Sequence, residues 1–170
     1  MLDAKRAFLH EQAELSTVIA SLQRANAYSS TASESDRQAL RIALKAALAE
    51  FGERYSSPVS HEVHLKHISQ FAQRISSECG GYLASGHLRI GVAQKALNLY
   101  LKFLWCYGTI PTPPHCPFDS RVIAKLPPEA RLPWTRLDDL AAYEALVAVA
   151  KRVAAPEELA VWELHAYQGT

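Results

Sequence analysis

The sequence predicts an all-α protein that forms a single domain over residues 1–170, with about six or seven helices and proline-rich loops between them. Alanine and leucine dominate the composition, and both favour helix. Apolar residues recur at three- and four-residue spacing along most of the chain, and no convincing alternating strand pattern appears. Hydrophobic residues make up 49% of the 170 residues, which is enough for one hydrophobic core.

The first part of the chain is expected to form three amphipathic helices, at about 3–25, 34–54 and 61–78. Ser33 followed by Asp36 has the spacing of a capping signal for the second of them. Pro58 ends that helix, because the residue before a proline avoids the helical region. Ser60 is then expected to cap the third helix.

Glycine and proline punctuate the second part. A glycine-rich turn at 80–91 precedes a very apolar helix at about 92–107. Proline-rich loops are expected at 108–118 and 127–135, on either side of a short helix at 120–126 that Asp119 would cap. The last helices are predicted at about 137–153 and 157–167.

The helix at about 92–107 carries one polar stripe on a mostly apolar surface. Lys95, Asn98 and Lys102 fall at i, i+3 and i+7, and Gln94 lies one turn before Asn98. Charged groups are costly to bury without partners. The stripe therefore either faces solvent along a narrow seam or lines a polar cleft.

Two short segments carry a resemblance to a known family. Residues 89–97 read Arg-Ile-Gly-Val-Ala-Gln-Lys-Ala-Leu, and residues 117–122 read Pro-Phe-Asp-Ser-Arg-Val. The segments resemble the hairpin and the later aspartate of helix–hairpin–helix DNA glycosylases at Gly91, Val92 and Lys95, and at Pro117, Asp119 and Val122. The family's hairpin proline, second glycine and threonine are replaced here by Ile90, Ala93 and Ala96. The resemblance covers about a fifth of the chain.

The resemblance implies a DNA base-repair enzyme of the glycosylase/AP-lyase type that acts on double-stranded DNA. Lys95 would be the nucleophile that forms a Schiff base with the sugar, and Asp119 would stabilise charge and move protons. Burial on an apolar helix would help Lys95 lose its proton. The expected nucleic-acid-binding residues are Arg89, Gly91, Gln94, Asn98, Lys102 and Arg121, and the side chains expected at the cleft are Trp105, His115 and Phe118.

Each of these interpretations has a structural alternative. Asp119 followed by Ser-Arg-Val is also an ordinary helix N-cap. The whole chain could instead be a non-catalytic helical module that binds a protein partner or nucleic acid. An enzyme requires Lys95 and Asp119 to converge on one cleft, whereas a binding module would show an exposed apolar patch.

The charge distribution leaves a similar choice. Residues 82–125 hold five Lys and Arg against one Asp, a net charge of +4, and residues 137–170 hold two against six Asp and Glu, a net charge of −4. The basic segment either contacts DNA or pairs with the acidic end of the chain.

Metal and cofactor sites are not expected. His61, His64 and His67 are three residues apart, so their side chains drift around the helix and cannot all reach one ion. Cys106, His115 and Cys116 have no recognisable metal spacing, and three cysteines do not suggest a disulfide scaffold. We predict no metal and no cofactor.

The start of the chain is charged and amphipathic and lacks an apolar core, so no secretory signal is expected. The longest apolar run, at 96–107, is too short for a membrane span. The sequence therefore predicts a cytoplasmic protein with no membrane association.

Overall fold

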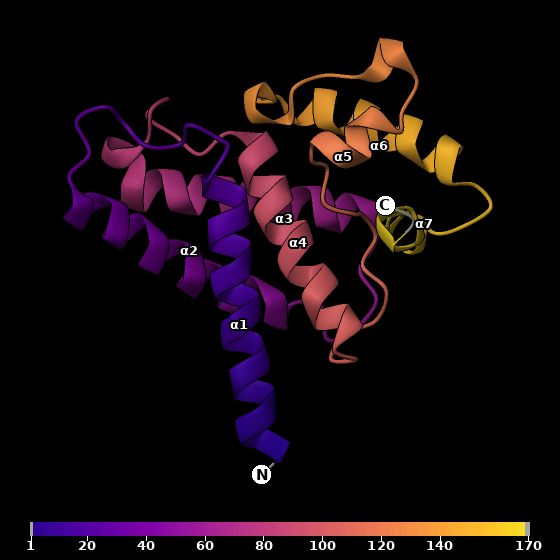
Figure 1. Cartoon of the computed structure of the whole chain (residues 1–170), viewed down its shortest axis with the longest axis horizontal. Helices are drawn as coiled ribbons and strands as arrows, with labels where there is room; N and C mark the ends of the chain where they lie inside the picture. The colour runs from indigo at the N-terminus through magenta and orange to yellow at the C-terminus, as the bar shows by residue number, and fades with distance from the viewer. Residues whose placement is uncertain (1, 169–170) are drawn as a thin grey trace.

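The computed structural model describes residues 2–168, and within this range the chain is helical with irregular connections (Figure 1). The seven α-helices are α1 (Leu2–Leu22), α2 (Glu34–Glu53), α3 (His61–Cys79), α4 (Ile90–Cys106), α5 (Ser120–Ala124), α6 (Leu140–Ala154) and α7 (Leu159–Gln168). Three short 3-10 helices are η1 (Gly80–Tyr82), η2 (Pro128–Ala130) and η3 (Trp134–Arg136). No strand forms among residues 2–168, so the all-α prediction is confirmed.

The predicted helix starts on the first half of the chain are confirmed by their caps. Ser33 Oγ accepts a hydrogen bond from Asp36 N at 3.2 Å, and the Asp36 carboxylate accepts one from Ser33 N at 2.9 Å. Ser60 Oγ accepts from Val63 N at 3.3 Å at the start of α3. These bonds satisfy backbone N–H groups that have no partner inside the helix.

Several predicted boundaries are wrong by two or three residues: the first helix ends at Leu22, the short helix at Ala124, and the last helix begins at Leu159. The helix expected from about 92 begins at Ile90, because Arg89 already has the extended backbone of an N-cap residue. The helix expected from about 137 begins at Leu140, because the Asp139 carboxylate accepts from Ala142 N at 2.9 Å and so caps the helix there.

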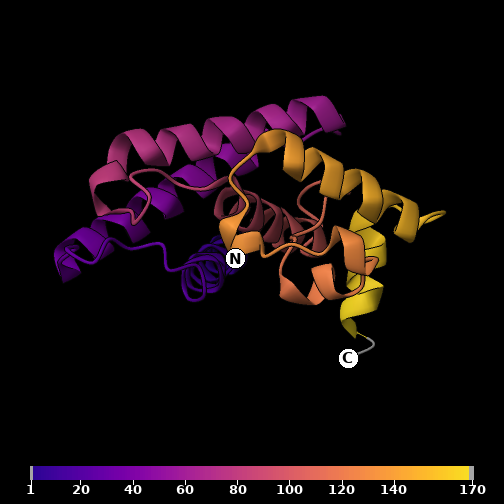
Figure 2. The ribbon, with the colours of Figure 1, turned by 90° about the horizontal axis from the view of Figure 1, so that it is seen from above.

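Helix α4 lies at the centre of the array and contacts α1, α2, α3 and α6. Seen from above, α2 and α3 lie side by side along one side of α4 (Figure 2). Helices α5, α6 and α7 lie together to the right of α4 in the same view. Eleven of the 17 residues of α4 are buried, which explains why this helix is apolar around most of its circumference.

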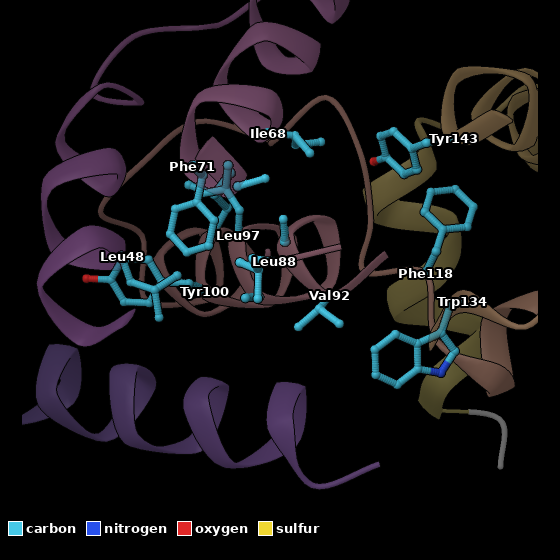
Figure 3. Close-up of a cluster of buried hydrophobic side chains, with 14 of the residues drawn as sticks. Leu48, Ile68, Phe71, Leu88, Val92, Leu97, Tyr100, Phe118, Trp134 and Tyr143 are labelled. Carbon is cyan, nitrogen blue, oxygen red and sulfur yellow. The ribbon is translucent and has the colours of Figure 1, made fainter. Parts of the chain in front are cut away.

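The hydrophobic core runs continuously from the first helices to the C-terminal part. Leu48, Phe71 and Tyr100 pack between α2, α3 and α4, while Phe118 and Trp134 extend the cluster toward the proline-rich loops (Figure 3). The proline-rich loops therefore belong to the same folded unit as the helices before them.

Candidate functional site

The first turn of α4 is held against the second proline-rich loop by a glycine. Gly91 N donates a hydrogen bond to Leu137 O at 2.7 Å, and a Cβ at this position would lie 1.7 Å from Trp134 O. No side chain fits in that space, so only glycine permits this close approach. The contact brings Trp134 against α4. Because the Gly91 N–H donates to Leu137 O, it does not point toward a bound nucleic acid.

Lys95, one turn after Gly91, is a nearly buried cation. It is only 8% exposed, and its Nζ lies 4.3 Å from the centroid of the Trp134 ring. This cation–π contact is favourable, but among residues 2–168 the ammonium has neither a hydrogen-bond acceptor nor an ion-pair partner within range. Burial lowers the pKa of Lys95, Asp119 partly offsets this, and nearby Arg24 lowers it further.

Asp119 is fixed beside Lys95 by the side chain of Gln94. Gln94 Nε2 donates to Phe118 O at 2.8 Å, and Gln94 Oε1 accepts from Phe118 N at 3.1 Å, which ties the loop to the turn of α4 that carries Lys95. Asp119 Oδ1 caps α5 by accepting from the backbone N–H groups of Arg121 and Val122, at 2.9 and 3.1 Å. Asp119 is therefore an N-cap residue and an electrostatic neighbour of Lys95 at once.

A pocket of about 400 Å³ lies on the other residues of this region; Trp134 and Ser120 line it, and Lys95 and Asp119 do not. It contains polar or charged side chains, Arg24, Arg131, Ser120 and Thr135, against an apolar wall formed by Ile123, Ala124, Leu132, Pro133 and Trp134. The Lys95 ammonium rests on Trp134, and Ser120 directly follows Asp119, so the candidate nucleophile, its acidic neighbour and a pocket lie in one region.

The other residues expected to bind nucleic acid are used within the protein. Arg89 Nη2 donates to Ala25 O at 2.6 Å, and the Arg121 guanidinium lies 5.3 Å from the centroid of the Tyr167 ring. Lys102 Nζ lies 2.7 Å from a carboxylate oxygen of Glu163, which itself is only 4% exposed. At Lys102 and Glu163, a residue of the basic middle segment therefore pairs with a residue of the acidic end of the chain.

The polar stripe of the central helix is neither a solvent seam nor the lining of an open cleft. Gln94 and Asn98 are both completely buried and bonded to other protein groups. Lys95 and Lys102 are mostly buried at either end of the stripe. The proline-rich loops and the C-terminal helices pack over the polar stripe of α4, which was expected to face solvent or a ligand.

Two of the three residues expected at the cleft lie in the core. His115 and Phe118 are both 0% exposed, so neither presents a ring face to a ligand. Trp105 is half-buried near the end of α4. The aromatic residue beside Lys95 is instead Trp134.

A second set of buried polar side chains surrounds Asn98. Asn98 Oδ1 accepts from His64 Nε2 at 2.8 Å, while its Nδ2 donates to Tyr143 Oη at 3.1 Å and to Gln94 Oε1 at 3.3 Å. All four side chains are fully buried. Since Asn98 accepts at Oδ1, the hydrogen-bond pattern places the His64 proton on Nε2.

Hydrogen bonds continue from both ends of this set. Tyr55 Oη donates to His64 Nδ1 at 2.6 Å and accepts from His67 Nδ1 at 3.0 Å. At the other end, Tyr143 Oη donates to His115 Nδ1 and His115 Nε2 donates to His61 Nδ1, both at 2.8 Å. We call this set the histidine chain; its members are Tyr55, His61, His64, His67, Asn98, His115 and Tyr143.

One assignment of protons satisfies every bond of the histidine chain with neutral rings. Burial lowers the pKa of His64 to about 3 and holds the pKa of His115 well below its usual range. The Asn98 amide in the middle is a poor proton relay, and the chain joins the turn after α2, helices α3, α4 and α6, and the loop before Asp119. Its role is to hold these elements together.

Only part of these arrangements could be predicted from the sequence. The spacing of His61, His64 and His67 was visible, but their partners lie 34 to 54 residues away along the chain, at Asn98 and His115. Arg24 and Arg131 were not identified, since nothing in the local sequence of either residue indicates that the two line one pocket. The one usable signal was Trp134, an aromatic residue directly after a proline in a loop.

No family model matches this chain, and neither does any curated protein or solved structure at the level of similarity required. Within residues 2–168, no group of three or more His, Cys, Asp or Glu side chains is arranged to hold a metal ion. The helices of that same range include none with the length and apolarity needed to cross a membrane.

Proposed function

We propose that this protein is a DNA base-repair enzyme of the glycosylase/AP-lyase type, with Lys95 as the nucleophile and Asp119 as its acid–base partner. The observation that carries the proposal is the state of Lys95, a mostly buried side chain whose amine has no hydrogen-bond acceptor among residues 2–168, a lowered pKa and a carboxylate close by. Lysine side chains are rarely buried to this extent without an ion pair, and perturbed groups of this kind concentrate at functional sites.

The chemistry follows from the free amine. Lys95 Nζ attacks C1′ of the ring-opened sugar at an abasic site, and a carbon–nitrogen bond forms. The carbonyl oxygen leaves as water and takes both amine hydrogens, which gives the Schiff base. Asp119 would assist these proton transfers and stabilise the cationic imine.

Asp119 can do this while it caps α5. Its two backbone hydrogen bonds are both to Oδ1, so Oδ2 accepts none from residues 2–168. One oxygen thus fixes the carboxylate and the other is available for proton exchange. A glycosylase or lyase must also take its target nucleotide out of the duplex, and the pocket beside Trp134 is the space next to Lys95 that could receive part of it.

Borohydride trapping tests the proposal directly. A labelled duplex with an abasic site is incubated with the protein and sodium borohydride, which reduces a Schiff base to a stable covalent adduct. The wild type should form the adduct, Lys95→Gln should lose it, and Lys66→Gln, which removes an exposed lysine of α3, should retain it. An adduct that survives in Lys95→Gln would exclude Lys95 as the nucleophile.

Asp119→Asn separates the acid–base role from the cap, because asparagine caps a helix as well as aspartate does. We expect the variant to fold normally and to form the adduct about 100-fold more slowly, as for the loss of a general acid–base group. An unchanged trapping rate would mean that Asp119 acts only as the N-cap of α5.

A second candidate function is a non-catalytic helical module that binds a protein partner or nucleic acid. It is favoured by large apolar side chains that stay exposed, with Phe8 and Ile19 of α1 each 60% exposed and Ile42 of α2 59%. The absence of both an adduct and salt-sensitive DNA binding would favour this candidate over the enzyme.

A further inference from the structure

The pocket beside Lys95 carries two guanidinium groups, at Arg24 and Arg131. Arg24 follows the end of α1, and Arg131 follows η2, so the two lie far apart in sequence and converge only in the fold. Arg131 Nε donates to Leu126 O at 2.9 Å, which fixes the guanidinium and leaves its two Nη groups free for another acceptor.

This region has a local excess of positive charge. None of Arg24, Lys95 and Arg131 forms an ion pair within residues 2–168, and Asp119 is the acidic group that acts on Lys95. The effect of Arg24 on Lys95 is repulsive. Cations that repel one another at the edge of a pocket are stabilised when an anion enters it.

We infer that this pocket binds a backbone phosphate of the DNA strand, held by Arg24 and Arg131 with the Ser120 hydroxyl as a further donor. The inference rests on the proposed function, and it supplies the phosphate contacts that the sequence assigned to Arg89, Lys102 and Arg121. Of those three, Arg89 binds Ala25 O and Lys102 pairs with Glu163, while Arg121 stays exposed beside the Tyr167 ring.

The shape and chemistry of the pocket fit a phosphodiester. Guanidinium groups bind phosphate oxygens through paired N–H donors, and the apolar wall of Ile123, Leu132 and Pro133 suits the carbon atoms of a deoxyribose. A phosphodiester carries one negative charge, which two guanidinium groups offset. A phosphate bound at Arg24 offsets the repulsion that Arg24 exerts on Lys95, whereas burial, the largest cause of the lowered Lys95 pKa, remains.

Binding to an unreactive substrate tests the pocket separately from the chemistry. The probe is a fluorescent duplex with a tetrahydrofuran residue, an abasic analogue without the aldehyde that a Schiff base requires. Its affinity is measured by anisotropy at several salt concentrations for Arg24→Gln, Arg131→Gln and Arg6→Gln. The last variant is a matched control, because Arg6 is an exposed arginine near the other end of α1.

We expect Arg24→Gln and Arg131→Gln each to weaken binding about tenfold near physiological salt. Each should also lower the slope of log affinity against log salt by about one, as for the loss of one phosphate contact. Arg6→Gln should bind like the wild type. Unchanged affinity and slope in both pocket variants, with thermal melts showing that all variants fold, would overturn the inference.

Two further arms separate the possible outcomes. Lys95→Met should bind the tetrahydrofuran duplex as the wild type does, and adding Arg24→Gln to it should weaken that binding. If the wild type forms no borohydride adduct but this binding is seen, the proposed chemistry is overturned and the phosphate site is supported. Calorimetric titration with thymidine 5′-monophosphate tests a free nucleotide as the ligand. Binding of that nucleotide through Arg24 and Arg131, without any binding of the duplex, would overturn the assignment to DNA.

Discussion

Asn98 and Lys95 are polar residues less than one turn apart on α4, and both are buried, yet their surroundings differ completely. Asn98 makes three hydrogen bonds to other side chains. Within residues 2–168, the Lys95 ammonium has the face of Trp134 and the fields of two charged neighbours, and no hydrogen bond. The helix therefore carries a fully partnered polar group next to an unpartnered one.

The difference separates polar groups that stabilise the fold from those that are candidates for function. Buried polar groups in folded proteins are nearly always hydrogen-bonded, so the histidine chain needs no ligand to account for it. Lys95 is mostly buried without such a bond among residues 2–168 and has a lowered pKa, and perturbed ionisable groups of this kind concentrate at functional sites. The predictions below follow from this contrast.

Acid should destabilise the protein through the histidine chain more than any single substitution does. His64 and His115 are neutral when folded, with His61, His67 and Lys151 opposing their protonation, and both regain a pKa near 6.5 when unfolded. The unfolded state therefore binds more protons below pH 6.5. Stability should fall by about 1.4 kcal/mol per pH unit for each histidine, until the pH reaches its folded pKa.

Urea denaturation between pH 7 and pH 4.5 measures this slope. His115→Gln should reduce the slope by nearly half whatever its own effect on stability, since it removes one of the two rings with the strongest shifts, and His67 adds a smaller one. His87→Gln, at an exposed histidine, is the matched control and should leave most of the slope intact. A stability that stays flat from pH 6.5 to pH 4.5 would contradict the neutral, buried state of the chain.

Removing the centre of the histidine chain should have the next largest effect. Asn98→Ala leaves His64 Nε2 without its acceptor and removes one donor each from Tyr143 Oη and Gln94 Oε1 inside the core, and we expect a loss of about 3 kcal/mol in the free energy of unfolding at pH 7. Asn98→Asp keeps the acceptor for His64 but loses the donor to Tyr143. A loss below 1 kcal/mol for Asn98→Ala would mean that the chain contributes little to stability.

The sequence predicted well what depends on near neighbours. The caps at Ser33, Ser60 and Asp119 and the seven helices follow from short-range patterns, because a capping side chain and its backbone partner lie within three residues. The site depends on contacts between distant segments. Gly91 meets Trp134, and Gln94 meets Phe118, only because α4 packs against two proline-rich loops.

The same limit explains which site residues were identified. Lys95 and Asp119 carry chemistry by residue type and stood out on a largely apolar stretch of sequence. Arg24 and Arg131 look like ordinary surface arginines until the fold places them on one pocket. His115 and Phe118 were placed at a cleft by their loop position, and the structure puts both in the core.

Lys95→Met should change stability least among these predictions. It should stabilise the protein, whereas Asn98→Ala should destabilise it. Methionine keeps the linear apolar part of the side chain and removes an ammonium that burial disfavours, so the free energy of unfolding should rise by about 1 kcal/mol at pH 7. The same variant should form no borohydride adduct. Urea denaturation and trapping on one protein preparation measure both effects. A loss of stability as large as that of Asn98→Ala would show that Lys95 is needed for the fold, and the contrast between the two residues would no longer hold.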